Sequence, residues 1–406
     1  MNEKSTSSKW LMFLILLISA ITVSLSQLKI SPVMGEVAAM LNVDGTQAAL
    51  LMSLFTVAGI FLSIPGAAVM AKTGNKNMLL ILMGTLVIGN VLGAVSNSFA
   101  VVMVSRIIEG ISYALIITVG VDLINNWFSG ATVGTATGIF NTFAAAANFI
   151  GMNASVAIYK ATNNLKLLWW IIAALAAVCF VLVFLFVKVP ERSAAEGGGL
   201  GEKVSLGEAA ANPALLVTCL SMLCLAFVLF GFITCNPTLF AAYGIDQSTS
   251  AFYASLNGLI GIPTCIISGI VIGKTGKPFL FAIVGAVLCA IICFTMPHLG
   301  GSNTACIIYA LATGIVPGGM IMTSMFIFTP QLAKRPQLIG LSMGLLNTLY
   351  YIGVFASTPV LTALAGENTS PANWTAPSLL MVGCCVVVLV CSVLAMGMSK
   401  KQKAAA

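Results

Sequence analysis

Residues 134–143 read GTATGIFNTF, and residues 340–349 read GLSMGLLNTL about 200 positions later. Both stretches place two glycines four residues apart, followed by an Asn-Thr pair. A second pair of stretches, AKTGNK at 71–76 and GKTGKP at 273–278, recurs at almost the same offset and in the same order. Recurrence in one order predicts that the two halves of the chain share one architecture.

The composition places these repeats in a membrane. Of the 406 residues, 59% are hydrophobic and 7% are charged, whereas a soluble domain carries about 25% charged residues. Apolar runs of about 20 residues suit spanning helices, and they exclude the short alternating strands of a transmembrane β-barrel. We predict an all-α membrane protein with twelve transmembrane helices, at residues 10–36, 46–70, 78–96, 99–126, 132–160, 167–188, 213–242, 248–272, 278–297, 303–330, 337–365 and 374–397.

Twelve spans in two halves give six spans to each half. An even number per half makes the repeat parallel, so that both halves face the same way. We therefore predict an N-terminal six-helix bundle at 1–188, a cytoplasmic linker at 189–212 and a C-terminal six-helix bundle at 213–406.

Lysine and arginine predict the orientation, because cytoplasmic loops of membrane proteins are rich in them. With both termini in the cytoplasm, 14 of the 18 basic residues lie on the inner side. These are Lys4, Lys9, Lys72, Lys76, Lys188, Arg192, Lys203, Lys274, Lys277, Lys334, Arg335, Lys400, Lys401 and Lys403. Anionic lipid then explains the net charge of +7 without a nucleic-acid partner. We expect a multi-pass protein of a bacterial cytoplasmic (inner) membrane.

Lys29, Arg106 and Glu109 fall inside predicted spans, where ionisable groups are costly and usually functional. At about 1.5 Å per residue, both cations lie in the outer half of the membrane, which indicates an anion site. Two structural alternatives stay open. Lys29 can extend to the outer interface, and Arg106 can pair with Glu109, three residues further along the same helix face.

Glu109 is the candidate proton carrier. Burial and a neighbouring arginine act in opposite directions on the proton affinity of a carboxylate. Binding of substrate or of a proton can therefore shift that balance.

The eleven cysteines lie almost wholly within predicted spans, without metal-type spacing. Cys289 and Cys293 share a helix face, and Cys384 and Cys385 are neighbours. We interpret them as small apolar groups that fill the core. No metal or other cofactor is expected.

The loop at 71–76 resembles the loop signature of the major facilitator superfamily, and the likeness extends over essentially the whole chain. Lys72, Gly74 and Lys76 match its basic and glycine positions, although Ala71 stands where that family has an acid. In the fourth span, residues 106–112 (RIIEGIS) are similar to the arginine–x–x–polar–glycine element of the family.

A subgroup is indicated by two further features. The Gly-Pro antiporter signature of the family is absent from the fifth span. The run Gln27-Leu28-Lys29 before Pro32 loosely resembles the cyanate- and nitrate-type anion permeases.

The resemblance implies a central cavity between the two halves and a gate at the cytoplasmic side. Besides Lys29 and Arg106, the candidate substrate-binding residues are Gln27, Tyr113, Asn141, Asn236, Asn347, Tyr350 and Tyr351, and Asn148 and Asn257 are further polar candidates. Each can equally form an interhelical hydrogen bond. The candidate gate residues are Asp122, Lys72, Lys76 and Lys274, with Asp122 expected to pair with Lys72 or Lys76.

These features favour a secondary transporter for a small organic or inorganic anion of monocarboxylate type, working by alternating access, with or without proton coupling. The alternative is efflux of a neutral or cationic amphiphile by proton antiport. An enzyme is disfavoured, since the sequence contains no nucleophile–base pair, metal cluster or nucleotide loop and one histidine only. We expect a monomer whose partners are a small anionic substrate and the lipid bilayer.

Overall fold

The computed structural model describes residues 3–63, 65–128, 132, 136, 139–140, 142–188, 208, 211–332, 339–366 and 370–405. All regular structure in these residues is helical, which confirms the all-α prediction. The first half contains α1 (Glu3–Leu28), η1 (Ser31–Val33), α2 (Met34–Leu41), α3 (Gly45–Leu62), α4 (Pro65–Thr73), α5 (Asn75–Val95), α6 (Phe99–Trp127), α8 (Phe143–Thr162) and α9 (Lys166–Phe186). The second half contains α11 (Pro213–Ala242), α12 (Gln247–Thr275), α13 (Pro278–Thr295), η2 (Met296–His298), α14 (Asn303–Thr313), η3 (Gly314–Met322), α15 (Thr323–Leu332), α16 (Ile339–Ala365), η5 (Pro371–Trp374) and α17 (Thr375–Ala405).

Eleven segments of the described chain are long and apolar enough to cross a membrane. They correspond to eleven of the twelve predicted spans. The other prediction, 132–160, begins among residues outside the description, and its described part is α8. The predicted linker at 189–212 also lies almost entirely outside the described residues. The repeat relation between the halves stays a prediction.

Two predicted spans are interrupted. The span predicted at 46–70 is divided into α3 and α4, with α4 beginning at Pro65. The span predicted at 303–330 contains the π-helix η3, which includes Pro317 and separates α14 from α15. Proline has no N–H to donate within a helix, and π-helical turns are frequent at functional sites. The stretch Pro317-Gly318-Gly319 thus lies in a local change of helix type.

The loop aspartates Asp44 and Asp246 begin helices. Asp44 accepts a 2.7 Å hydrogen bond from the Gln47 amide at the start of α3. Asp246 accepts one of 2.9 Å from the Ser248 amide at the start of α12. The hydroxyl of Thr249 also donates to Asp246, and together these bonds hold the pKa of that carboxyl below its usual value. Asp44 and Asp246 are thus the N-cap residues of α3 and α12.

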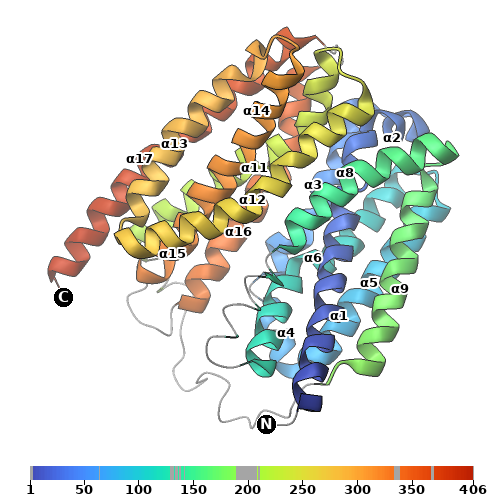
Figure 1. Ribbon diagram of the computed structural model, residues 1–406, viewed down its shortest axis with the longest axis horizontal. Coiled ribbons are helices and arrows are strands. Elements are labelled where there is room, and N and C mark those ends of the chain that lie inside the picture. The colour runs from blue at the N-terminus through green and yellow to red at the C-terminus, as the bar shows by residue number, and fades with distance from the viewer. Residues whose placement is uncertain are drawn as a thin grey trace.

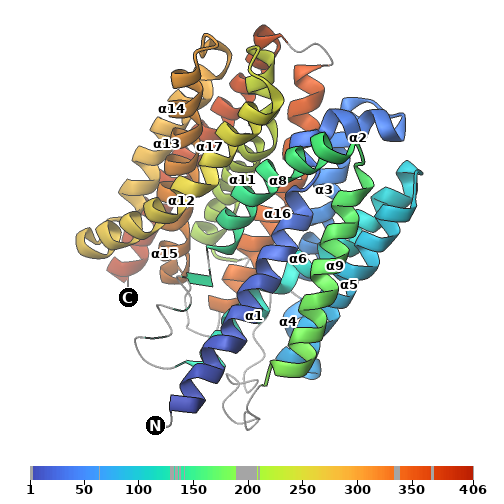
Figure 2. The same cartoon turned by 45° about the vertical axis from the view of Figure 1, so that its right-hand side comes forward.

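The apolar core forms three clusters. One is built from buried residues between Met12 and Val187, and a second from buried residues between Ala214 and Val388. A third joins both halves, with Ala226 from α11 packed among first-half side chains. Figures 1 and 2 show the corresponding arrangement, with α5, α6 and α9 side by side away from α13 and α17.

Glycines allow the closest helix contacts. A Cβ at Gly110 of α6 would overlap the carbonyl oxygen of Phe55 in α3. A Cβ at Gly353 of α16 would overlap the carbonyl oxygen of Leu223 in α11. Since each obstacle is backbone, no side-chain rotation can relieve it. Only glycine therefore permits these crossings.

Gly110→Ala should lower the thermal unfolding temperature of the detergent-purified protein. Overpacking of a tight contact costs about 1–3 kcal/mol, since α3 and α6 must move apart. Gly383→Ala in α17 is the matched control, because its new Cβ would meet nothing within 4 Å. Equal unfolding temperatures for both variants would contradict the role given to Gly110.

Candidate functional site

The three membrane-embedded charges meet at one carboxylate oxygen. Glu109 Oε2 lies 3.0 Å from Lys29 Nζ and 2.7 Å from Arg106 Nη1. Lys29, which follows α1, is 2% exposed, and the two α6 residues are 0% exposed. The snorkelling alternative for Lys29 is therefore wrong, whereas the alternative left open for Arg106, its pairing with Glu109, is formed. We call these three residues the ion cluster; its formal charge is one positive unit.

Two polar side chains complete the surroundings of Lys29. Lys29 Nζ donates to Asn90 Oδ1 of α5 at 2.5 Å, and Ser26 Oγ of α1 donates to Glu109 Oε2 at 2.8 Å. The Nζ atom also lies 4.8 Å from the ring centroid of Trp169. Sequence reasoning missed Asn90 and Ser26. Their signal was a polar residue within an apolar span, which is a weak one because many such residues only join helices.

Arg106 holds three helices together. Its Nε donates to the Leu51 carbonyl of α3 at 2.9 Å, and its Nη1 and Nη2 donate to the Ser26 and Gln27 carbonyls of α1 at 2.7 and 2.9 Å. The last carbonyls of a helix lack intrahelical donors and carry partial negative charge. The Arg106 guanidinium at the end of α1 supplies hydrogen-bond donors to these carbonyls and a positive charge beside them. Arg106 is thus occupied by protein atoms, with Glu109 where a substrate carboxylate was expected.

Glu109 is only half satisfied. Its Oε1 is buried and has no hydrogen-bond partner among the described residues. Beside it, a Cβ at Gly89 of α5 would lie 2.7 Å from Glu109 Cγ and 2.9 Å from its backbone nitrogen. Glycine at this position lets α5 approach the ion cluster. A buried acceptor without a donor costs about 1–3 kcal/mol.

An aromatic bridge links the ion cluster to the second half of the chain. The guanidinium carbon of Arg106 lies 4.5 Å from the ring centroid of Phe55. The Phe55 and Tyr113 centroids are 5.5 Å apart, those of Tyr113 and Tyr351 are 6.1 Å apart, and those of Tyr351 and Tyr350 are 5.5 Å apart. Three predicted substrate-binding tyrosines are therefore brought together, although Tyr113 comes from α6 and the other two from α16.

A neutral amide cluster lies within the second half. Asn257 and Asn236 donate from Nδ2 to Thr313 Oγ1 at 3.0 and 3.5 Å, and Asn236 Oδ1 has no partner among the described residues. Thr313 directly precedes the π-helix η3. A Cβ at Gly314 would overlap the Asn257 carbonyl oxygen, so α12 and η3 touch here. Sequence reasoning did not single out Thr313.

The remaining polar candidates are less determined. Gln27 Nε2 and both amide atoms of Asn148 are buried without a partner among the described residues. Asn148 lies against Gly258, where α8 crosses α12. Asn347 is half-buried on α16, and Asn141 lies outside the described residues.

The expected pairing at the cytoplasmic gate is wrong for Lys76. Asp122 accepts a 2.5 Å hydrogen bond from Asn75 Nδ2. Lys76 Nζ instead donates to the Phe184 carbonyl at 2.9 Å. The physical reason is that Phe184 lies in the last turn of α9, whose carbonyls need donors. Lys274 is exposed, and the side chain of Lys72 lies outside the described part.

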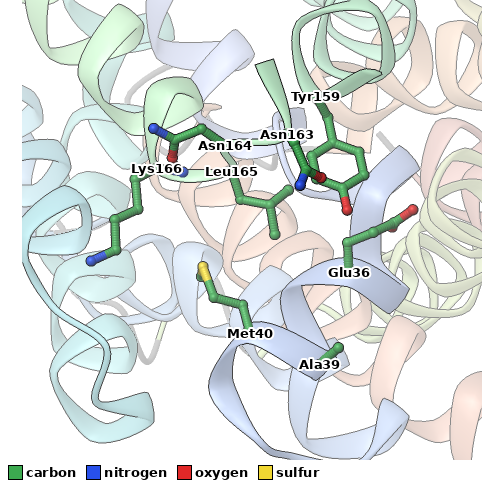
Figure 3. A pocket seen from close by; sticks show the side chains of 8 residues that line it. All are labelled: Glu36, Ala39, Met40, Tyr159, Asn163, Asn164, Leu165 and Lys166. Atoms are coloured by element: carbon green, nitrogen blue, oxygen red, sulfur yellow. Dashed lines mark hydrogen bonds between the residues drawn. The ribbon is translucent and has the colours of Figure 1, made fainter. Parts of the chain in front are cut away.

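The two halves are joined at the other side of the molecule. Gln247 Nε2 at the start of α12 donates to Glu36 Oε1 of α2 at 2.7 Å, and Lys160 Nζ of α8 donates to Ser248 Oγ at 2.8 Å. Glu36 also lines a polar hollow of about 430 Å³ with Tyr159, and Figure 3 shows both side chains away from Lys166. This hollow is open and separate from the ion cluster.

Arg106→Lys should lower the unfolding temperature although it keeps the charge beside Glu109. A lysine cannot reach three carbonyls at once, and each hydrogen bond of a charged group contributes about 1.5–3 kcal/mol. Lys160→Arg is the control, since Lys160 pairs with Asp246 at 50% and 60% side-chain exposure and surface pairs contribute about 0–1 kcal/mol. If Arg106→Lys lowered the unfolding temperature no more than Lys160→Arg does, Arg106 would not hold α1, α3 and α6 together as described.

The comparison with known families agrees with this arrangement. A family model described as "Major Facilitator Superfamily" matches residues 12–358. The matched region contains the ion cluster, the aromatic bridge and the amide cluster. Its extent, together with the apolar helices, identifies the chain as a multi-pass membrane protein that belongs to the major facilitator superfamily, a family of secondary transporters.

Proposed function

We propose that this protein is a secondary transporter that moves a small monoanion of monocarboxylate type by alternating access, with a proton bound at Glu109 as the coupling ion. The observation that carries the proposal is the ion cluster, in which two buried cations share a single carboxylate oxygen. An excess positive charge in a low-dielectric interior favours an incoming negative charge.

The coupling follows from competition for the two cations. While Glu109 is ionised, it occupies both Lys29 and Arg106. Protonation of Glu109 removes its negative charge and leaves the cations free to attract the substrate anion. Loss of the proton restores the pairs and expels the anion. Because linkage is reciprocal, the bound anion must favour protonation as much as the proton favours the anion.

The second half supplies neutral groups to the same substrate. Its predicted spans carry no embedded cation, whereas Asn236, Tyr350 and Tyr351 offer amide and hydroxyl groups. A substrate with two anionic ends would require a cation on each side. A monoanion fits this asymmetry, and the loose resemblance to cyanate- and nitrate-type permeases points to the same charge. Efflux of a cationic amphiphile is disfavoured by the positive charge of the ion cluster.

The transport cycle requires the two halves to rock against each other. We assign residues 1–188 and 213–406 to the two six-helix bundles, with both termini in the cytoplasm of a bacterium. The bonds from Gln247 to Glu36 and from Lys160 to Ser248 must then break when the outer side opens. Asp122, Lys72, Lys76 and Lys274 are the groups proposed to close the inner side.

Glu109→Gln should separate anion movement from the proton gradient. In proteoliposomes, we expect gradient-driven uptake of radiolabelled acetate or lactate to fall at least tenfold, while exchange of internal for external anion continues. Glutamine keeps the hydrogen-bonding shape but cannot take up a proton. Glu36→Gln is the control and should retain gradient-driven uptake. A Glu109→Gln protein with unchanged pH dependence would refute the coupling role.

Lys29→Ala and Arg106→Ala should each reduce anion uptake at least tenfold, because each removes one of the two cations. Lys166→Ala, outside the ion cluster and outside the contacts between the halves, is the control for charge. Ligand stabilisation provides an independent measurement. Formate, acetate, lactate, nitrate and cyanate should raise the unfolding temperature of the wild-type protein, whereas choline should not. If both variants transported these anions normally, the site assignment would be wrong.

A further inference from the structure

Three cysteine thiols gather in the core of the second half, away from the ion cluster. Cys289 and Cys293 lie one turn apart on α13, and Cys385 faces them from α17. Their three Sγ atoms lie within 4.8 Å of one another, and those of Cys293 and Cys385 are 3.8 Å apart. All three residues are buried. The transport mechanism proposed above does not use this thiol triad.

The spacing of the triad matches that of metal ligands. Three sulfurs at about 2.3 Å from one cation in a trigonal plane lie about 4.0 Å from each other. The observed separations, from 3.8 Å to at most 4.8 Å, require shifts below about 1 Å. Thiols that pack as apolar groups show similar separations, so the two interpretations must be separated by experiment.

Charge decides which cation fits. A buried complex is favoured when it is neutral, because an uncompensated charge in an apolar core is costly. Soft sulfur ligands favour Cu(I) and Zn(II) among biological metal ions. A single Cu(I) with one thiolate and two neutral thiols is neutral and uses all three ligands, whereas Zn(II) prefers four ligands.

A hydrogen-bond donor is available for the thiolate. The hydroxyl of Tyr309 is buried and has no hydrogen-bond partner among the described residues. Cys293 and Cys289 lie near this hydroxyl. A thiolate formed in the triad would therefore have an O–H group nearby that needs an acceptor.

A fourth thiol beside the triad is less buried. Cys384, next to Cys385 on α17, is half-buried and lies near Cys224 of α11. Ligand exchange from Cys384 to Cys385 would bring a thiophilic ion from the edge of the helix bundle to the triad.

We propose that Cys289, Cys293 and Cys385 form a binding site for one Cu(I)-type cation, contrary to the expectation from sequence. On binding, one thiol releases its proton to solution and binds the ion as a thiolate, and the other two thiols bind as neutral ligands, without any change of oxidation state. The bound ion joins α13 to α17 and so braces the second half.

The test uses Ag(I), a monovalent stand-in that stays in one oxidation state, with the full-length reduced protein in detergent. In a Cys265→Ser background, which lacks the exposed thiol but keeps the triad, we expect about one Ag(I) per chain to be retained after removal of free ion, together with a rise in unfolding temperature that grows with ion concentration. Cys293→Ser and Cys385→Ala should each abolish the retained ion and the temperature rise. Cys219→Ser, a buried cysteine of α11 outside the triad, should keep both.

Three results would overturn the site. They are no retained Ag(I) in the wild-type protein, unchanged retention in both triad variants, and equal loss in Cys219→Ser. The apo variants are first compared by unfolding temperature, and Cys293→Ala replaces Cys293→Ser if the serine variant does not fold. Anaerobic Cu(I) loading should reproduce the Ag(I) result. Because the readouts are ion content and stability, they do not depend on anion transport.

Discussion

The shared carboxylate of Glu109 is the interaction on which the first half depends. Burial of three charges is tolerable only when each is paired and hydrogen-bonded, because breaking a buried pair costs about 3–5 kcal/mol. Lys29 and Arg106 reach the same oxygen only because the end of α1, the middle of α6 and the glycine-lined face of α5 converge. The clamp of Arg106 on the carbonyls of α1 and α3 fixes that convergence. The stability of the first half and the proposed ion coupling thus rest on the same atoms.

This arrangement leaves the cluster slightly incomplete. One glutamate oxygen has no donor among the described residues, and the formal charge is not balanced. A fully satisfied cluster would only brace the helices, whereas this one keeps a buried acceptor open to a further partner. The aromatic bridge from Phe55 to Tyr351 gives the cluster a direct contact with the second half. A change in the charge of the cluster can therefore alter the packing between the halves.

The second half uses different chemistry. Its buried polar groups are neutral amides and hydroxyls around Thr313, next to a helix segment that proline has already disturbed. Its core carries a group of thiols where the first half has none comparable among its described residues. Neutral groups orient a ligand without adding charge, which suits the singly charged substrate proposed above. The first half therefore contributes buried charges, and the second half contributes neutral hydrogen-bonding groups.

The sequence by itself determined the helices, because span length, hydropathy and capping residues such as Asp44 and Asp246 are local properties. It also determined the Arg106–Glu109 pair, since residues three apart share a helix face. Only the tertiary structure decided that the Lys29 side chain points inward and that Asn90 Oδ1 accepts its hydrogen bond. A span's hydropathy tells that one face is apolar, but not which helix faces it or at what height. The neighbouring helix and its height are fixed by close backbone contacts between distant segments, such as that of Gly110 in α6 with Phe55 in α3. No local sequence pattern contains such a contact.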